Sequence, residues 1–396
     1  MKRVLGSILV FGGGELQKSM ILHCKSLGLK TVVIDPSPNA FCKDLADAFE
    51  CVGGDDFEGT CTCVDKHDIK AVITAATDKP LVMMARVAEK YGLCYIDEKA
   101  ATIATDKNLM KQVLIGASVN CAQGALIDKN NPELPVDLFW PVVVKPLDNS
   151  GSRGVFICDD LEDFTKKVNE SKEYTKSDFL IVEEYIGGKE YSVEAIHSKD
   201  KTTVIAITEK ITTEAPYNVE LGHIIPATVS ESSKKEIEDI IQKIATSFNY
   251  KYCASHTEVK INERGVFVIE TSPRLGGDFI TSELVPGSTG VNIESCLISL
   301  AFGVEPKIEH TKKDYCGVFY FDLSQGIVKD LKAYDSSNND AIVYYQLNLS
   351  KGQEIKRITN SIDRYGCVIL NTETKEELLA EKSEIFRIHK ELIEII

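Results

Sequence analysis

Short apolar runs alternate with amphipathic segments over the first 93 residues of the chain. Three of these runs, Ile8–Phe11, Thr31–Ile34 and Ala71–Thr74, have the length and composition of buried strands. The segments between them carry apolar residues at helical spacing. Strands that alternate with helices in this way predict βαβ units and a parallel sheet. The first part of the chain is therefore expected to have an α/β fold.

From about residue 100 the order of the predicted elements changes. A helical segment is predicted at Ala100–Leu114, and long helices follow at Ser233–Phe248 and Asn292–Phe302. The predicted strands are Trp140–Pro146, Gly154–Cys158, Phe179–Tyr185, Tyr191–His197, Thr203–Ile207, Ser255–Ile261 and Gly265–Glu270. After Pro306, short strands and a last charged helix, Lys375–Ile395, are expected. This order favours α+β lobes over a second doubly wound sheet.

Composition and charge narrow the class of protein. A chain of 396 residues is too long for one compact core, and 43% apolar with 27% charged residues is ordinary for a soluble globular protein. The formal net charge of −15 argues against nucleic acid as a partner, because nucleic-acid binding needs clustered Lys and Arg. A small anionic substrate must therefore meet local positive charge.

The cysteines and the apolar runs indicate the compartment. Twelve cysteines lie mostly singly in apolar runs, which is typical of small buried side chains in a reducing environment. Only Cys61 and Cys63 are close in sequence, and one CxC pair is a weak metal signal. The run Val4–Phe11 is too short for a signal peptide or a membrane span, and no later run is long enough. A soluble cytoplasmic protein without a membrane partner is expected.

Three glycines, Gly12–Gly14, follow the first predicted strand, and Asp35 ends the second, as at the start of a dinucleotide-binding fold. The full GxGxxG pattern is absent, because Gln17 stands where the last glycine is needed. A glycine turn after a first strand is also common without a nucleotide. Binding of NAD is therefore the less favoured interpretation.

A Gly/Ser-rich loop follows the strand that ends in Lys145, and it contains Ser150, Gly151, Ser152 and Gly154. Small residues let backbone N–H groups approach phosphate oxygens, and Lys145 would add a positive charge. The GxxxxGK[ST] pattern is absent, and a Gly/Ser turn between two strands is often only a turn. The loop is a candidate for triphosphate binding only together with its neighbours.

The segment Ile181–Glu190 is a second candidate, because a strand stops at Gly187–Gly188 and resumes with an acidic residue. Its backbone would suit an adenine edge, and its carboxylate would suit ribose hydroxyls. The alternative is a solvated hairpin with ordinary surface acids.

Two acids in a predicted hairpin carry the strongest signal. Glu258 lies four residues before Asn262 and Glu270 lies five residues after Gly265, so the turn can bring them opposite each other. Glu270 ends an apolar run, where a carboxylate is costly unless a cation neutralises it. Like charges opposite each other also destabilise a sheet. Oxygen ligands with few other donors suit magnesium that bridges nucleotide phosphates. A magnesium site is therefore predicted.

Together these segments resemble the ATP-grasp superfamily over nearly the whole chain. The matching motifs are, in order, Asp106-Lys107, Val144-Lys145-Pro146, the Ser150–Gly154 loop, Glu183–Ile186, Gly188-Lys189-Glu190 and the pair Glu258 and Glu270. The resemblance implies an ATP-grasp fold, α/β and α+β, in three domains. These are an N-terminal Rossmann-like domain at 1–100, an ATP-grasp domain at 101–310 with a lid at about 118–188, and a small C-terminal α+β domain at 311–396.

The resemblance also implies a role for each matching residue. The implied ATP-binding residues are Lys107 and Lys145 with the loop at the phosphates, Glu183 and the backbone of Glu184, Tyr185 and Ile186 at adenine, and Glu190 at ribose. Glu258 and Glu270 would bind magnesium, with manganese as an alternative ion. Ser272 stands where the family usually has asparagine, so it is the third implied ligand, and the geometry of a second metal is left open.

Within the superfamily the sequence is most similar to the L-amino acid ligases. These share the His-Thr-Glu motif at His256–Glu258, and an acid and a histidine three residues apart at Glu220 and His223. The implied catalytic residues are Arg274, Gly277 and His256, and the implied substrate residues are Glu220, His223 and Asp278. A lone histidine is also often structural. Some of these ligases have a bulky residue at the position of Asp278, so substrate choice is not transferred.

The resemblance implies an ADP-forming ligase that activates a carboxylate as an acyl phosphate and joins it to an amine. The expected partners are small-molecule carboxylates and amines, and a homodimer is expected. One alternative is a purine-pathway enzyme similar to phosphoribosylglycinamide synthetase, or a bicarbonate-activating enzyme. Another alternative is a nucleotide-binding regulatory module without catalysis, which Ser272 would favour.

Overall fold

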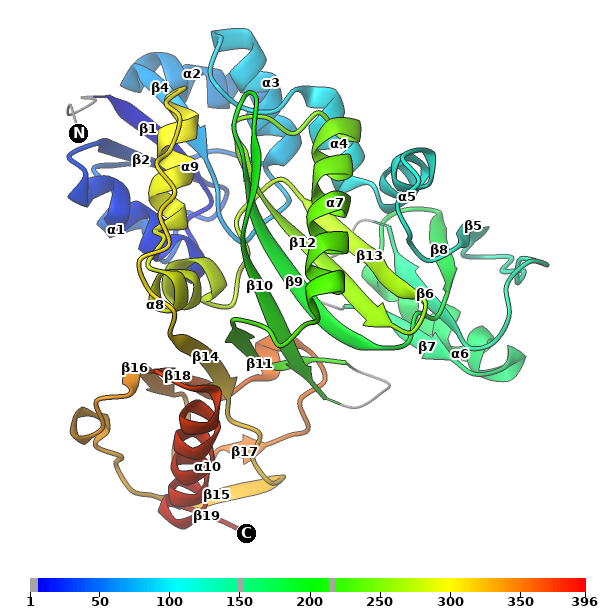
Figure 1. Ribbon diagram of the computed structural model, residues 1–396, viewed down its shortest axis with the longest axis vertical. Coiled ribbons are helices and arrows are strands. Elements are labelled where there is room, and N and C mark those ends of the chain that lie inside the picture. Colours follow the sequence, from blue (N-terminus) through cyan, green and yellow to red (C-terminus); the bar gives the residue numbers. More distant parts are fainter. Residues whose placement is uncertain (1–5, 148–152, 214–217) are drawn as a thin grey trace.

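The computed structural model describes residues 6–147, 153–213 and 218–396, and its first sheet has four parallel strands in the order β3-β2-β1-β4 (Figure 1). The elements of this unit are β1 (Ser7–Phe11), α1 (Lys18–Ser26), β2 (Lys30–Asp35), β3 (Ala48–Cys51), α2 (Phe57–His67), β4 (Ile69–Ile73) and α3 (Leu81–Tyr91). The three predicted strands are β1, β2 and β4, so the α/β prediction is confirmed. The sequence prediction missed β3, because this edge strand is half-exposed and has no apolar run.

Two helices replace the single helical segment predicted at Ala100–Leu114. They are α4 (Glu98–Thr105) and α5 (Lys107–Gly116). Asp106 separates them, because its side chain accepts hydrogen bonds from the backbone N–H groups of Asn108 and Leu109 and so caps α5. This break places Lys107 in the first turn of a new helix.

A small antiparallel sheet has the strand order β5-β8-β6-β7. Its elements are β5 (Gly124–Asp128), β6 (Val142–Pro146), β7 (Phe156–Cys158), α6 (Leu161–Ser171) and β8 (Phe179–Glu184). Val142 and Val144 of β6 pack on Phe164 and Val168 of α6. Alternation along β6 therefore places Lys145 on the face away from α6.

The largest sheet has eight strands in the order β13-β12-β9-β10-β11-β14-β18-β16. Its strands are β9 (Lys189–His197), β10 (Thr202–Thr212), β11 (Glu220–Ile225), β12 (Cys253–Asn262), β13 (Gly265–Ser272), β14 (Tyr315–Tyr320), β16 (Ile342–Leu347) and β18 (Gly366–Thr372). Every neighbouring pair is antiparallel. β10 is longer than the predicted Thr203–Ile207, and β11 was not predicted.

Helices cover both faces of this sheet (Figure 1). On one face, α7 (Glu231–Ser247) packs with Ile237 and Ile241 in the same core cluster as Tyr191 and Val193 of β9. On the other face lie η4, a π-helical turn (Ile280–Leu284), α8 (Val285–Thr289) and α9 (Ile293–Ala301). These last helices also contact the N-terminal unit, since α9 packs on both α1 and β4. The N-terminal unit and the large sheet therefore share one apolar core.

The C-terminal segment continues the large sheet. After β14, it adds β15 (Gly326–Leu331), β16, β17 (Glu354–Ile355), β18, α10 (Lys375–Leu392) and β19 (Ile393–Ile395). The predicted helix Lys375–Ile395 is therefore too long, because Ile393–Ile395 pairs with β15 in a three-stranded sheet. In the described part of the chain, no helix combines the length and the apolar character that a membrane span requires.

Candidate active site

Charged side chains gather on one face of the large sheet. Successive residues of a strand point to opposite faces, and Tyr191 and Val193 of β9 pack toward α7. The other face carries the charged residues that contact one another: Glu190, Glu194, Lys210, His256, Glu258 and Glu270. The candidate site is therefore built on rigid strands.

Strand register arranges part of this face in rows. Glu194, His256 and Ser272 are neighbours across β9, β12 and β13, and the next row contains Glu258 and Glu270. The two glutamates are direct partners in the hairpin. The register predicted from their spacing around the turn is confirmed.

Lys210 lies at the centre of three carboxylates. Its Nζ is 2.9 Å from Glu190, 3.2 Å from Glu258 and 3.3 Å from Glu220, and its side chain is 2% exposed. Burial alone would lower the pKa of Lys210, but the neighbouring negative charges outweigh burial and raise the pKa well above its usual value. Burial also acts to raise the pKa of Glu258, yet Lys210 and His256 bring it well below the usual value. Both side chains are therefore ionised at neutral pH.

Glu194 is fully buried and binds His256. Nδ1 of His256 lies 2.5 Å from Oε1 of Glu194, and Oε2 of Glu194 accepts a hydrogen bond of 3.3 Å from the backbone N–H of Gly276. Burial would lower the pKa of His256, but the charge of Glu194 prevails and raises it to about 9. His256 is therefore an imidazolium at neutral pH, and Glu194 connects it to the glycine turn at residues 276–277.

Glu270 is neutralised by a lysine. Nζ of Lys107, from the first turn of α5, lies 3.1 Å from Oε2 of Glu270. Burial would lower the pKa of Lys107, but the carboxylate of Glu270 raises it. The sequence argument that Glu270 requires a metal cation overlooked this neighbour, because the two residues are far apart in the chain. Lys107 and Lys210 supply the positive charge that the two opposed glutamates need.

A second buried cluster lies in the small sheet. The carboxylate of Glu183 is 2.6 Å from Nζ of Lys145 and 2.9 Å from Nζ of Lys111. Burial would raise the pKa of Glu183, but Lys145 and Lys111 lower it. Lys111, from α5, was not predicted. The cluster holds the Lys145 ammonium in place, and the predicted contact of Glu183 with adenine stays a prediction.

Arg274 is bound to the N-terminal unit. Its Nε donates to Oδ1 of Asp78 at 2.8 Å and its Nη2 donates to Oδ2 at 3.2 Å. The hydroxyl of Ser272 donates to Oδ1 of the same carboxylate at 2.5 Å. The hydroxyl hydrogen of Ser272 is thus donated to Asp78, and the lone pairs of its oxygen could still coordinate a metal. A parallel bridge between Ala75 and Leu275 fixes the same turn to the end of β4.

Most residues predicted to bind ATP line one cavity of about 190 Å³, the lid-side cavity, between the small sheet and the β12–β13 hairpin. They are Lys107, Lys145, Glu183, Glu184, Tyr185, Ile186 and Glu190. The predicted metal ligands Glu258 and Glu270 and the predicted catalytic residue Arg274 line the same cavity. Glu220, predicted to bind substrate, also lines this cavity. Ser150, Gly151 and Ser152 lie outside the described residues. Gly154 is buried with φ of +77°.

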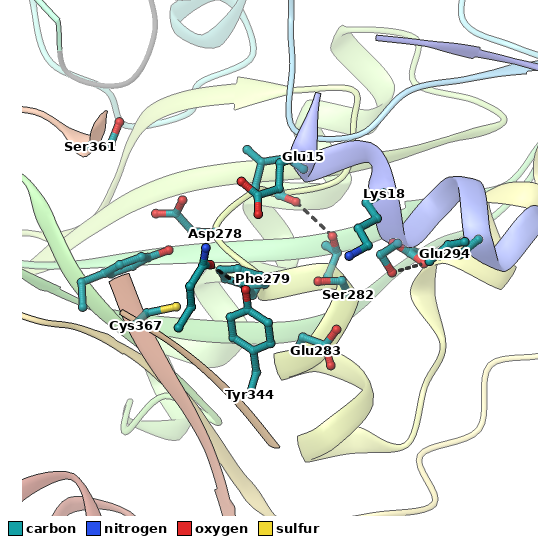
Figure 2. A pocket seen from close by; sticks show the side chains of 18 of the residues that line it. Glu15, Lys18, Asp278, Phe279, Ser282, Glu283, Glu294, Tyr344, Ser361 and Cys367 are labelled. Carbon is teal, nitrogen blue, oxygen red and sulfur yellow. Dashed lines mark hydrogen bonds between the residues drawn. The ribbon is translucent and has the colours of Figure 1, made fainter. Parts of the chain in front are cut away.

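A second cavity of about 830 Å³, the large cavity, lies where the N-terminal unit, the large sheet and the C-terminal segment meet (Figure 2). Gly277 and Asp278 line it. Asp278 accepts two hydrogen bonds from Arg364, of 2.7 and 2.9 Å, and lies 3.4 Å from Nε2 of His223. Burial would raise the pKa of Asp278, but His223 and Arg364 lower it strongly. His223 is buried and reaches the cavity wall only through Asp278.

Two of the predicted metal ligands, Glu258 and Glu270, are suited to bind a magnesium ion. Glu258 and Glu270 offer carboxylate oxygens in adjacent strands, and their side chains are 30% and 29% exposed, so each can accept a further cation. Among the described residues, no group of three or more His, Cys, Asp or Glu side chains is arranged to hold a metal ion. Two carboxylates suit a metal whose other ligands are phosphate oxygens and water.

Two backbone N–H groups of the glycine turn after β1 donate hydrogen bonds to nearby side chains of the N-terminal unit. The backbone N–H of Gly13 donates to Asp35 at 2.8 Å, and that of Gly14 donates to Gln17 at 2.9 Å. Gln17 is buried and donates to the carbonyl of Ala75. These two amide donors are thus bonded within the N-terminal unit.

Four residues of the site were missed in the sequence: Asp78, Lys111, Glu194 and Lys210. Glu194 had a usable signal, because an acid in the apolar run Tyr191–His197 is as costly as one at Glu270. Lys210 and Asp78 had no such signal, because their partners come from distant segments.

Comparison with known proteins agrees with the resemblance to the ATP-grasp superfamily that the sequence predicts. Residues 138–283 match the family model of the ATP-grasp domain. The chain is similar to alanine–anticapsin ligase of Bacillus subtilis (strain 168), with 27% identity over 230 residues, which are 52% of this chain and 48% of the relative. The match therefore spans about half the length of that relative.

Solved structures share the fold over the whole chain. An L-amino acid ligase from Bacillus licheniformis superposes with a TM-score of 0.81 at 16% identity, covering 99% of this chain and 98% of that chain. The biotin carboxylase domain of 2-oxoglutarate carboxylase from Hydrogenobacter thermophilus, in complex with MgADP, ADP and bicarbonate, has a TM-score of 0.74 at 20% identity, covering 99% and 90%.

The chain thus carries an ATP-grasp domain at residues 138–283, and its fold is that of the solved ligase structures. Within this class, the predicted resemblance to carboxylate–amine ligases is confirmed by the domain match together with the alanine–anticapsin ligase.

Proposed function

We propose that this protein is an ATP-dependent, ADP-forming ligase that joins a carboxylate, such as that of an amino acid, to an amine. One observation carries the proposal. Residues 274–277 border both cavities: Arg274 lines the lid-side cavity together with Lys107 and Lys145, and Gly277 lines the large cavity. A phosphoryl donor on one side and an acceptor on the other would react at this turn.

The chemistry follows from the poor reactivity of a carboxylate, whose leaving group would be an oxide. Transfer of the terminal phosphoryl group of ATP to a carboxylate oxygen gives a mixed anhydride and ADP. An amine nitrogen then attacks the acyl carbon, loses a proton and displaces phosphate. In this proposal Lys107 and Lys145 bind phosphate oxygens. Glu258 and Glu270 would hold magnesium or manganese, which when bound would supply charge neutralisation at the phosphoryl group.

Arg274 and Gly277 stabilise the oxyanion that develops at the acyl carbon. Arginine has five N–H donors, and three atoms of Arg274 each donate one bond to Asp78 or Leu275. Two donors therefore remain for a substrate oxygen. The N–H of Gly276 is engaged by Glu194, so the N–H of Gly277 is the backbone donor of this turn. His256, charged and held by Glu194, adds positive charge beside Glu258.

Phosphate release with ATP and magnesium tests the proposal across amino acids and small carboxylates, supplied singly and in pairs. Dependence on two components, with ADP as the product, is expected. AMP and pyrophosphate would overturn the mechanism. Glu270→Gln keeps the shape of the side chain but loses its charge, so turnover should fall by about 10³-fold or more. Glu309→Gln, at an exposed ion pair with Lys307, serves as the control. Unchanged turnover in Glu270→Gln would remove its metal role.

A second candidate is a bicarbonate-activating or purine-pathway ATP-grasp enzyme, and the structural similarity to a biotin carboxylase domain favours it. Bicarbonate and phosphoribosylamine, tested beside the amino acids, separate the two functions. A regulatory module without catalysis is excluded by any substrate-stimulated ATP hydrolysis.

The homodimer and the cytoplasmic location remain part of the proposal, as do the domain boundaries given above. Light scattering on the purified chain tests the dimer, and fractionation of cells that express it tests the location.

A further inference from the structure

The large cavity has an unbalanced charge at one end. Glu283 of η4 and Glu294 of α9 line this end, and Lys18 of α1 and the exposed Glu15 also line the cavity. Within residues 6–147, 153–213 and 218–396, none of these four side chains forms an ion pair within 4.0 Å. These carboxylates outnumber the one lysine, so they are not all neutralised within the cavity wall.

The other charged groups of the cavity do not correct this imbalance. Asp278 and Arg364 neutralise each other through two hydrogen bonds, and the guanidinium of Arg364 also stacks on Tyr320 at 3.7 Å. His23 is half-buried and its Nε2 lies 2.5 Å from the hydroxyl of Ser295. Burial lowers the pKa of His23, so its ring is neutral at pH 7.

Glu294 is the most informative of the three acids. It is 5% exposed, and its one hydrogen bond in the described structure comes from the neutral hydroxyl of Ser19, 3.0 Å from Oε2. A carboxylate this deeply buried is costly unless a cation neutralises it. Elsewhere in the site each buried acid has such a cation, as Glu183 has Lys145 and Glu194 has His256. Glu294 faces the cavity instead (Figure 2).

We propose that the end of the large cavity formed by Glu283 and Glu294 binds a positively charged group of the substrate, an ammonium or guanidinium that does not take part in the reaction. This inference rests on the proposed ligase function and names the substrate class: a basic amino acid or a diamine.

The position of the acids explains why the bound cation is not the reacting group. Figure 2 shows Glu294 and Lys18 at one side of the cavity and Asp278 at the other. Asp278 directly follows Gly277, where the acyl carbon would lie in the proposed function. A substrate that reacts at Gly277 and fills the cavity therefore extends its far end to the acids. About 830 Å³ is room enough for such a molecule, since ligand sites commonly measure 300–1,000 Å³.

Calorimetric binding to the full chain without ATP tests the inference with two matched pairs of probes. L-Lysine is compared with L-norleucine, which lacks only the terminal ammonium, and 1,4-diaminobutane is compared with n-butylamine. In each pair, the probe with the additional ammonium group should bind more tightly by about tenfold or more, as expected for a charged hydrogen bond. Equal affinity within both pairs would overturn the inference.

Glu294→Gln identifies the carboxylate responsible. The glutamine amide oxygen can still accept the hydrogen bond of Ser19, so the variant should fold and lose the preference for L-lysine over L-norleucine. Glu283→Gln should reduce the preference, and the exposed control Glu309→Gln should keep it. An unchanged preference in both Glu294→Gln and Glu283→Gln would overturn the assignment.

A pH series on the wild-type chain gives an independent readout. Burial raises the pKa of Glu294 to about 7, so this carboxylate becomes available to a cation as the pH rises from 6 to 8, and burial also raises the pKa of Glu283. The ratio of L-lysine to L-norleucine affinity should increase with pH, and a flat ratio would contradict the inference.

The two proposals fail in different ways. A preference for the charged probes without ADP formation would refute the ligase function and leave the cation site in place. ADP formation with neutral substrate pairs, without a preference for the charged probes, would refute the cation site and leave the ligase function in place.

Discussion

Replacing Glu294 by glutamine should stabilise the protein at alkaline pH and have little effect in acid. Burial raises the pKa of Glu294 from 4.5 to about 7. One pKa unit corresponds to about 1.4 kcal/mol, so ionising Glu294 costs the folded chain ~3 kcal/mol. Because the folded state holds the proton more tightly than the unfolded state, stability falls as the pH rises from 4.5 to about 7, and the full cost applies above that range.

Glutamine removes this cost because it carries no charge at any pH. The free energy of unfolding of Glu294→Gln should exceed that of the wild type by ~3 kcal/mol at pH 8 and by ~1 kcal/mol at pH 5. An unfolding entropy of about 2.1 cal/mol/K per residue gives roughly 0.8 kcal/mol/K for the whole chain. The midpoint temperature should therefore rise by about 4 °C at pH 8 and about 1 °C at pH 5.

Differential scanning calorimetry at the two pH values measures this difference. Glu309→Gln is the matched control, since its ion pair with Lys307 is exposed and should give no change beyond about 1 °C. The same rise at both pH values, or a destabilised Glu294→Gln at pH 8, would show that Glu294 is not an uncompensated buried charge.

Three further changes test the described interactions. Lys210→Met removes the buried cation that lies between three carboxylates, so the free energy of unfolding should fall by about 3–5 kcal/mol, measured by urea denaturation; a fall below about 1 kcal/mol would contradict the buried cluster. Asp278→Asn removes the partner of Arg364, so amide hydrogen exchange at residues 361–366 should become faster, and unchanged exchange would show that the pair does not hold this segment. Glu194→Gln should lower the pKa of His256 from about 9 toward 6.5 in an NMR titration. The stability that this pair provides is present below pH 6.5 and is lost as the pH rises through about 9, so wild type and Glu194→Gln should converge at alkaline pH.

Local spacing allowed the hairpin to be predicted from the sequence. A tight turn fixes which residues of two adjacent strands face each other, so the pairing of Glu258 with Glu270 followed from counting residues to Asn262 and Gly265. The roles of the residues implied to bind ATP came from the family resemblance, and they stay predictions. The helix break at Asp106 also had a local signal, an aspartate in a capping position, which the helical periodicity obscured.

Contacts between distant segments could not be predicted from local spacing in the sequence. Lys210 meets its carboxylates only because β10 pairs with β9 through a register shift between Val204 and Ala206, and no short-range pattern reveals that shift. Asp78 reaches Arg274 because two domains pack together. The sequence therefore predicted which acids belong to the site, but it missed the lysines that lie beside them, and the metal at these acids stays a prediction.

The continuous eight-stranded sheet makes shortened forms of this chain prone to self-association. Four residue pairs join β11 to β14, so a chain cut before Tyr315 would leave Gly222–Ile225 without strand partners on that side. Ile224 and Ile225 lie in this segment and are now buried. An open strand edge with apolar side chains is a template for another chain. The C-terminal segment thus protects the rest of the molecule from aggregation, in addition to lining part of the large cavity.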